Sequence, residues 1–364
     1  MVVVAATLVV ACHGKKREQP SVTVAAASAE PVPRHAALVA AVDTRAFPAA
    51  LGEMKIPANN PQTDAKIALG HQLFFDERLS VDGSRSCYSC HTNEHGTGGH
   101  LPTAVGAKDK ALTRHSPVLW NVGYLPAYYW DGRANSLEAQ ALAAWAGGNM
   151  GVGKDGLAAK AHEIGNIPTY RGRFQQAFGT PGASPEKVVQ AISAYERTLV
   201  CSDSAYDRYA RGDKQALTSQ QKLGLGLFVG AAGCSTCHTP PHFSLAYTTA
   251  GGAYFNTGRG TEGKQTADVD PGRAQVTGQD RDWAAFKVPT LRNVAKSGPY
   301  FHDGSAKTLE EAVRFMASGG TPNKNHTPLL RDRNLSDEQI AQIVAFLGAL
   351  DCPGELEPPR APTD

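Results

Sequence analysis

The sequence predicts a mainly α-helical protein made of two tandem domains of the same kind. Three observations lead to this. Apolar segments with helical spacing begin at Ser or Thr residues, one 22-residue segment is repeated, and each copy follows a C-x-x-C-H pentapeptide. The chain has 364 residues, which is enough for two medium-sized domains. It also has 37 glycines and 23 prolines, so long irregular connections are expected between the helices.

The predicted helices share a polar N-terminal cap and an apolar stripe. Ser and Thr side chains accept hydrogen bonds from amides of the first turn, and a Gln or Glu three residues later completes a capping box. The expected helices are 61–76, Ser136 to about 146, Ser184 to 200, Thr218 to 229, one that opens at Thr308 and carries Leu309, Val313 and Met316, and Ser336 to about 350. Residues 92–116 and 239–279 are rich in glycine and polar residues and are predicted to be loops.

Two pentapeptides carry the clearest chemical signal. Residues 87–91 read Cys-Tyr-Ser-Cys-His, and residues 234–238 read Cys-Ser-Thr-Cys-His. In c-type haem attachment the two thiols bond to the porphyrin and the adjacent His binds the iron. A four-Cys zinc site is the alternative, but zinc does not need a His directly after each Cys pair. We therefore expect two cytochrome c-like domains, each wrapping one covalent haem c. The predicted haem-binding residues are Cys87, Cys90, His91, Cys234, Cys237 and His238.

An internal repeat supports a duplicated domain. Residues 117–138 align without a gap on residues 289–310, with ten identities in 22 positions. In this register Trp130 stands where His302 stands. The haem His lies 40 residues before the shared Asp-Gly pair in the first copy and 65 residues before it in the second. The second domain therefore carries an insertion of 25 residues, expected in its glycine- and threonine-rich loop.

The ends of the chain differ in composition from its centre. Residues 1–12 form an apolar stretch that ends at Cys12, which is typical of a bacterial lipoprotein signal with an acylated cysteine; an ordinary export signal and a structural strand are the alternatives. Residues 13–50 are predicted to be a flexible tether, and residues 353–364 a disordered tail. The two haem domains are then 51–205 and 206–352.

The net charge and the cysteines limit which partners and which cellular compartment the sequence predicts. The net charge of +2 gives no electrostatic case for nucleic-acid binding. Cys201 and Cys352 each follow an apolar helical segment, so we expect a disulfide between them, with two buried thiols as the alternative. Covalent haem attachment implies an oxidising, extracytoplasmic compartment in which a disulfide persists. The expected location is therefore the periplasm, with a lipid anchor at Cys12.

These motifs resemble the bacterial di-haem cytochrome c peroxidases. The wider superfamily includes MauG-type enzymes, which oxidise tryptophans in partner proteins. The match covers roughly residues 55–350, and its clearest stretches are 69–76, both haem motifs, 129–133, 291–294 and 299–304. The resemblance implies reduction of hydrogen peroxide to water with electrons from a small redox protein, a cytochrome c or a cupredoxin. A MauG-like oxidase and an electron-transfer cytochrome without peroxidase chemistry are the alternatives. A homodimer is also left open.

The resemblance assigns unlike roles to the two haems. It implies that the C-terminal haem receives electrons and is ligated by His238 and Met316, because thioether ligation raises the reduction potential. The alternative for Met316 is a core-filling side chain. MauG-type enzymes carry Tyr at this position, whereas the neighbouring Phe315 cannot ligate iron. The N-terminal haem, with His91 as its proximal ligand, is then the peroxide site.

Four further residues follow from the same resemblance. Trp130 matches a tryptophan that lies between the haems for electron transfer, with a plain buried aromatic as the alternative, and Gln140 matches a distal glutamine. Ala107 stands where some relatives have a His that caps the resting iron, so an open peroxide site is expected. Asn149 stands where the family has a distal Glu. An amide can orient peroxide but cannot act as a general acid or base, so weak activity is expected.

The resemblance also implies calcium between the haems, bound by an Asn side chain and two backbone carbonyls. Ser297 and Pro299 would supply the carbonyls, but His115 occupies the Asn position, and His is a poor ligand for calcium. The sequence therefore leaves calcium open. His100 and His115 are candidates to replace the missing distal acid, and with His95 they are the candidates for an alternative distal ligand.

Overall fold

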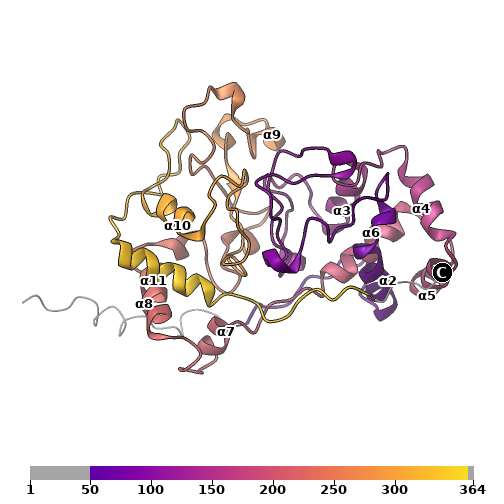
Figure 1. The fold of residues 1–364 in the computed structure, drawn as a ribbon, viewed down its shortest axis with the longest axis horizontal. Helices are drawn as coiled ribbons and strands as arrows, with labels where there is room; N and C mark the ends of the chain where they lie inside the picture. Colours follow the sequence, from indigo (N-terminus) through magenta and orange to yellow (C-terminus); the bar gives the residue numbers. More distant parts are fainter. Residues whose placement is uncertain (1–49, 360–364) are drawn as a thin grey trace, which may run out of the picture. The chain divides into compact units, whose positions relative to one another are not determined.

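The computed structural model describes residues 50–359, all within one compact unit of the chain. The predicted signal, Cys12 and nearly all of the predicted tether lie outside the described residues. Among residues 50–359, no helix is both long and apolar enough to span a bilayer. The helices divide between two hydrophobic cores, and Figure 1 shows their two groups.

The first core is built by five helices. They are α2 (Asp64–Phe75), α3 (Leu137–Ala146), α4 (Leu157–Gly165), α5 (Pro168–Phe178) and α6 (Pro185–Glu196). Helix α2 packs against α5 and α6, and α3 also packs on α6. The predicted caps Thr63, Ser136 and Ser184 each accept a first-turn amide. The sequence did not predict α4 and α5, and α6 ends four residues before the predicted Val200.

The second core is built by α8 (Ser219–Val229), α10 (Leu309–Ala317) and α11 (Asp337–Gly348), with the short α7 (Ala205–Ala210) beside them. Helices α8 and α11 pack against each other, and α10 packs on α11. Capping boxes at Thr218, Thr308 and Ser336 confirm the predicted starts of α8, α10 and α11. Both cores therefore use helices that the sequence marks at their first turn.

A glycine permits the closest helix crossing in each core. A Cβ on Gly70 of α2 would lie 1.8 Å from the Ala191 carbonyl oxygen of α6. A Cβ on Gly224 of α8 would lie 1.9 Å from the Gln342 carbonyl oxygen of α11. Any side chain at either glycine would push the two helices apart. The two domains thus use the same kind of glycine-mediated helix contact.

The predicted insertion folds as irregular chain with little regular structure. It contains β1 (Tyr254–Phe255) and α9 (Ala274–Thr277), and β2 (Phe286–Lys287) follows it. The two strands pair antiparallel, with Tyr254 opposite Lys287 and Phe255 opposite Phe286. Elsewhere the described chain forms short 3₁₀ turns at Glu77–Leu79, Asn93–His95, Ala107–Asp109, Val122–Tyr124, Cys234–Thr236, Leu245–Tyr247, Thr266–Asp268 and Asp280–Asp282.

The repeated segments have the same local structure. Asn121 and Asn293 occupy equivalent positions and share the left-handed backbone conformation, with φ of 63° and 59°. Each Asn side-chain oxygen accepts a hydrogen bond from the backbone amide of a cysteine, Cys201 in the first copy and Cys352 in the second. The bridges Tyr128–Ala134 and Tyr300–Ala306 also correspond. The duplication inferred from ten identities is therefore a structural one.

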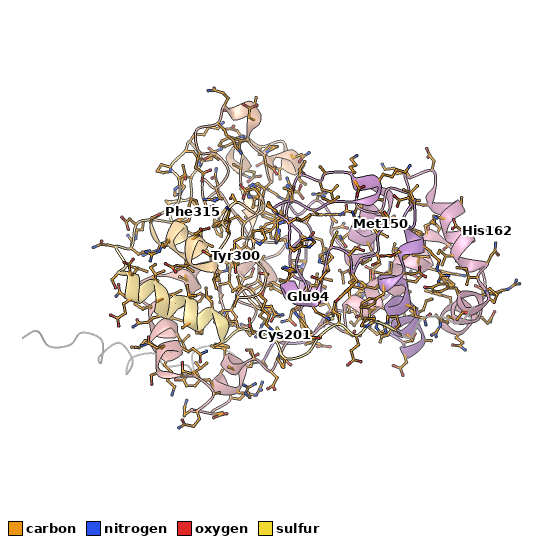
Figure 2. The ribbon with its side chains drawn as sticks, in the orientation of Figure 1. Glu94, Met150, His162, Cys201, Tyr300 and Phe315 are labelled. Atoms are coloured by element: carbon orange, nitrogen blue, oxygen red, sulfur yellow. A yellow bond between two sulfur atoms is a disulfide. The ribbon has the colours of Figure 1, made fainter. Side chains whose placement is uncertain are left out.

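Cys201 and Cys352 form a disulfide, as the sequence predicted. Both are buried in the first core, although Cys352 follows α11 of the second core (Cys201 is labelled in Figure 2). The chain beyond Cys352 continues along the first group of helices. Leu356 is 3% exposed there, and its backbone exchanges two hydrogen bonds with the Asn93 side chain. A buried leucine and paired backbone groups thus anchor this part of the predicted tail.

Candidate haem cavity

One cavity of about 1150 Å³ collects most of the predicted site residues. It exceeds the range of about 300–1,000 Å³ that is usual for small-ligand pockets. Both motif histidines line it, as do Cys234, Cys237 and Met316. Cys90 lies beside the lining residue Ser116, and Cys87 packs on the first core. The two pentapeptides thus approach one continuous space from different parts of the chain.

The two motif histidines are held in the same way. Nδ1 of His91 lies 3.0 Å from the Thr97 carbonyl oxygen, and Nδ1 of His238 lies 3.0 Å from the Phe243 carbonyl oxygen. A carbonyl only accepts, so each Nδ1 carries the proton and Nε2 keeps a free lone pair. Burial lowers the pKa of each imidazole to about 4, against the opposing effect of these carbonyls. Both rings are therefore neutral, which is the form in which an imidazole could ligate iron.

Helix α10 contributes Met316 to the cavity lining. Met316 lines the cavity with Ala312, Val313 and Ala317 of the same helix. Phe315 packs instead against Phe301, with ring centroids 5.2 Å apart, and does not line the cavity (Phe315 is labelled in Figure 2). Among the α10 side chains that line the cavity, the methionine is the one with a group that could ligate a haem iron.

Small and amide residues form part of the cavity wall. Gln140, Ala143 and Gly147 line it from α3 and its C-terminal end, at helical spacing. Asn149 lines it from the following turn, and its carbonyl accepts the Ala107 amide at 2.9 Å. Lys110 runs along this wall, with Cδ 3.1 Å from the place that a Gly148 Cβ would take. The sequence did not single out Lys110.

The histidines of the 92–116 loop are not equivalent. His100 is exposed, its ring lies 5.4 Å from that of His95, and neither residue lines the haem cavity. His115 does line it, but its Nδ1 is engaged with the Leu101 carbonyl oxygen at 2.8 Å. Ala107 is 3% exposed and faces the turn at Gly151. The chain therefore brings no free imidazole from this loop to the His91 side of the cavity.

Trp130 lines the cavity and has partners in both repeated halves of the chain. Its Nε1 donates to the His115 carbonyl oxygen at 2.8 Å, and its ring lies 6.5 Å from the His302 ring in an edge-on arrangement. The carbonyl of Trp130 accepts the Lys287 amide at 2.7 Å from β2. The Trp130 turn is thus held by both the 92–116 loop and the second domain. Its repeat partner His302 stacks on Phe286, with centroids 3.6 Å apart.

An ion-pair network fastens the same turn. Asp131 is 1% exposed and pairs with Arg114 at 2.6 Å and with Arg133 at 2.9 Å. Arg114 also pairs with Asp270 of the insertion at 2.7 Å, and Arg273 donates to the Asp131 carbonyl. The inserted loop therefore supports the segment that carries Trp130.

Glu196 and Lys287 are two of the ionisable cavity-lining residues that sequence reasoning missed, and the pKa of each is strongly shifted. Glu196 is 6% exposed with no partner for Oε2, and burial raises its pKa to about 8. Burial lowers the pKa of Lys287 to about 8, although Asp131 opposes this shift. The sequence offered one sign of Glu196: it is an ionisable residue on the apolar, buried face of helix α6. Lys287 lies in a two-residue strand, which leaves no such pattern.

The lining suits two haem groups better than a metal cluster. It is mostly apolar, with two neutral imidazoles and a set of basic side chains able to pair with haem carboxylates: Arg114, Arg133, Arg259, Lys264, Lys287 and Arg333. Within residues 50–359, no three His, Cys, Asp or Glu side chains gather as metal ligands would. The alternative of a four-Cys zinc site is therefore wrong.

The fold and this cavity are those of a di-haem c-type cytochrome, and comparisons with known proteins agree. A profile of the di-haem cytochrome c peroxidase family matches residues 64–215. "Cytochrome-c peroxidase IdrP1" of Denitromonas iodatirespirans is 35% identical, over 91% of this chain and 96% of its own. "Methylamine utilization protein MauG" of Methylorubrum extorquens is 33% identical, over 84% of each chain.

A solved structure extends this likeness to three dimensions. The crystal structure of a MauG-like protein associated with microbial copper homeostasis has a TM-score of 0.78 and 29% identity, covering 86% of this chain and 97% of that one. The chain belongs to the di-haem cytochrome c peroxidase family. The family implies two c-type haems and a peroxidase-like oxidoreductase function.

Proposed function

We propose that the protein reduces hydrogen peroxide to water at the His91 site, with electrons that arrive at the His238 site from a small redox protein. The observation that carries this proposal is the lining of one cavity that contains both motif histidines. This lining includes the Gln140 and Asn149 amides, which can hydrogen-bond peroxide, and the Met316 thioether, which suits a haem of high potential. In the proposal the two amides serve the His91 site, and the methionine serves the His238 site.

Each protein group has a defined task in this proposal. Haem supplies the redox-active iron, and the chain supplies its ligands, His91 at one site and His238 with Met316 at the other. The Gln140 and Asn149 amides orient peroxide by hydrogen bonding. In this proposal the Trp130 indole carries electrons between the sites; its contacts with His115 and His302, from the two halves of the chain, support this role. The missing carboxyl group at position 149 makes proton delivery the weak step.

The location and partner form part of the same proposal. Covalent haem attachment and the Cys201–Cys352 disulfide both favour an extracytoplasmic compartment, and we propose the periplasm with a lipid anchor at Cys12. The donor is a cytochrome c or a cupredoxin. A MauG-like oxidation of a partner protein remains the second candidate, because relatives named MauG match over most of the chain.

Peroxide turnover separates these candidates. The purified holoprotein is expected to consume peroxide with a reduced cytochrome c or cupredoxin, at a rate below that of relatives with a distal Glu. Absence of turnover with every such donor would contradict the proposal. If the oxidised state then decayed only on addition of a second protein, the oxidase function would replace it.

A further inference from the structure

Glu196 is a buried carboxyl group that has no task in the proposed function. It is 6% exposed, it lines the haem cavity, and its Oε2 atom has no hydrogen-bond partner. It is also the last residue of α6, where the negative end of the helix dipole disfavours an ionised carboxylate. Burial raises its pKa to about 8, so the side chain is a neutral carboxylic acid at pH 7.

Helices α6 and α11 are equivalent in the duplicated domains. The carbonyls of Ala191 in α6 and Gln342 in α11 lie at the two glycine-mediated helix contacts. The backbone amides of Cys201 and Cys352 each donate to the Asn side chain of a repeated segment. In both pairs the second residue comes 151 positions after the first. One register therefore relates α6 to α11 as far as the disulfide.

In this register Glu196 stands where the second domain has Leu347. Leu347 is 4% exposed and lines the same cavity. One turn earlier, Ser193 is fully buried with no partner for its Oγ atom, and it stands where the second domain has Val344. An aliphatic residue serves for packing in the second domain, so packing does not explain a carboxyl group in the first, where burying it costs free energy.

The end of α6 is packed against the helix that leads into the first haem motif. The Cys87 amide donates to the Phe74 carbonyl of α2 at 3.1 Å. The Phe74 ring lies 5.3 Å from that of Tyr195, which precedes Glu196 in α6. His91 and Glu196 both line the cavity. Glu196 thus belongs with the haem that Cys87 and Cys90 would hold.

The titratable and charged groups that act on Glu196 are few, and they come from α3, from α6 itself and from the segments beside them: Glu138, Arg197, Tyr195, Tyr128 and Cys87. Arg197 opposes the rise in the pKa of Glu196 and Glu138 adds to it, and these two form an ion pair at 2.7 Å. Burial raises the pKa of Cys87, Tyr128 and Tyr195, and the Glu196 charge acts in the same direction.

The other elements packed against α6 have ionisable groups with partners elsewhere. Lys66 of α2 donates to a side-chain amide oxygen and to a backbone carbonyl, both at 3.1 Å, and Nε2 of His71 lies 2.6 Å from a backbone carbonyl. Lys160 of α4 pairs with Glu163 at 2.8 Å. The Tyr124 ring lies 4.9 Å from the ring of a second-domain histidine. Neither lysine is therefore placed to neutralise a Glu196 carboxylate.

We propose that Glu196 holds a proton that the His91 site exchanges with solvent when its haem iron changes oxidation state. When an oxidant takes one electron from the iron, the O–H bond of the Glu196 carboxylic acid breaks and one proton passes to water, because a carboxylate is favoured beside the added positive charge. When a donor returns one electron, the carboxylate takes one proton back. Leu347 gives the second domain no such group. Only the use of this proton in peroxide reduction rests on the proposed function.

The reduction potential of each haem as a function of pH provides the first test. Spectroelectrochemistry of the wild-type holoprotein from pH 6 to 10 is expected to show that reduction of the His91 haem becomes less favourable above about pH 8. The change should approach tenfold in the equilibrium constant for each pH unit, which is about 59 mV for one electron. Glu196→Gln keeps the shape of the side chain without an ionisable group, so it should lose this dependence. Glu163→Gln removes an exposed carboxyl group of α4 and is the matched control, which should behave as wild type.

Infrared spectroscopy provides a second test that does not require a variant to fold. The reduced-minus-oxidised difference spectrum of the wild type at pH 9 should contain the C=O band of a protonated carboxylic acid on the reduced side, and this band should shift in D₂O. Glu196→Gln should lack the band, and the conservative Glu196→Asp should keep it. A wild-type spectrum without such a band would overturn the proposal.

Peroxide turnover tests how the proton is used. In the wild type, kcat/KM for peroxide is expected to fall above about pH 8, where the acid has given up its proton. In Glu196→Gln it should be severalfold lower at pH 7 and lack this alkaline decrease.

The outcomes are distinct. A pH-dependent potential that persists in Glu196→Gln would overturn the proposal and assign the proton to another group, such as Lys287, whose pKa burial lowers to about 8. A wild type without peroxide turnover would contradict the proposed function but would leave the potential and infrared results intact.

Discussion

Replacing Asn149 with Glu tests whether the missing carboxyl group limits this protein. The backbone around position 149 is fixed: the Asn149 carbonyl accepts the Ala107 amide at 2.9 Å, and the Met150 amide donates to the Ala144 carbonyl at 3.2 Å. A Glu would start from the same Cα and reach one methylene further into the cavity. The neighbouring Lys110 stem runs beside Gly148, so its ammonium favours the ionised carboxylate.

The magnitude follows from the task of a general acid–base group. Such a group contributes about 10²–10⁴-fold when it is well placed. Position 149 was not selected for Glu in this chain, so we expect the low end or just below it, an increase in kcat/KM for peroxide of about tenfold. This corresponds to about 1.4 kcal/mol of activation free energy. The gain should disappear as the pH falls through the carboxyl pKa, near 4 for an unperturbed Glu, because the protonated form cannot accept the peroxide proton.

The assay is steady-state peroxide consumption with a reduced donor, measured across pH 4 to 8. Asn149→Gln is the matched control, because it has the length of Glu without an ionisable group. Equal gains in Asn149→Gln and Asn149→Glu would refute the acid–base reasoning and indicate a packing effect. No gain in Asn149→Glu, together with high wild-type turnover, would mean that another group already delivers the proton, and Glu196 and Lys110 would be substituted next.

Three further outcomes are expected. The EPR spectrum of the oxidised protein should show one high-spin and one low-spin ferric haem, because no free imidazole caps the His91 site; two low-spin signals would contradict this. Met316→Leu should abolish the haem that ascorbate reduces, and an unchanged reduced spectrum would assign the sixth ligand elsewhere. Arg292→Met should lower the free energy of unfolding in urea by roughly 3–5 kcal/mol, because it leaves Asp207 charged in a site where both side chains are 0% exposed. Arg314→Met, which removes two exposed ion pairs, should change the urea midpoint little.

Local signals account for what the sequence predicted well. Each C-x-x-C-H motif is complete in five consecutive residues. Each motif histidine is held by a backbone carbonyl that lies within the next six residues. The starts of α8, α10 and α11 depend on a side chain that reaches three residues along the chain. The duplication was visible because equivalent turns need the same Asn, Tyr and Gly residues. Such features depend on residues that are close in the sequence, so they can be predicted without knowledge of the fold.

Tertiary structure alone decided which similar residues reach the cavity. His95, His100 and His115 lie in one loop, yet only His115 lines it, because its main chain is tied to Trp130 and His302. Glu196 reaches the cavity because helix α6 packs against α2 and α3. Cys352 joins the first core by pairing with a residue 151 positions away, and the tail that follows is held by its contacts there. These placements depend on contacts between distant segments, which no local pattern records.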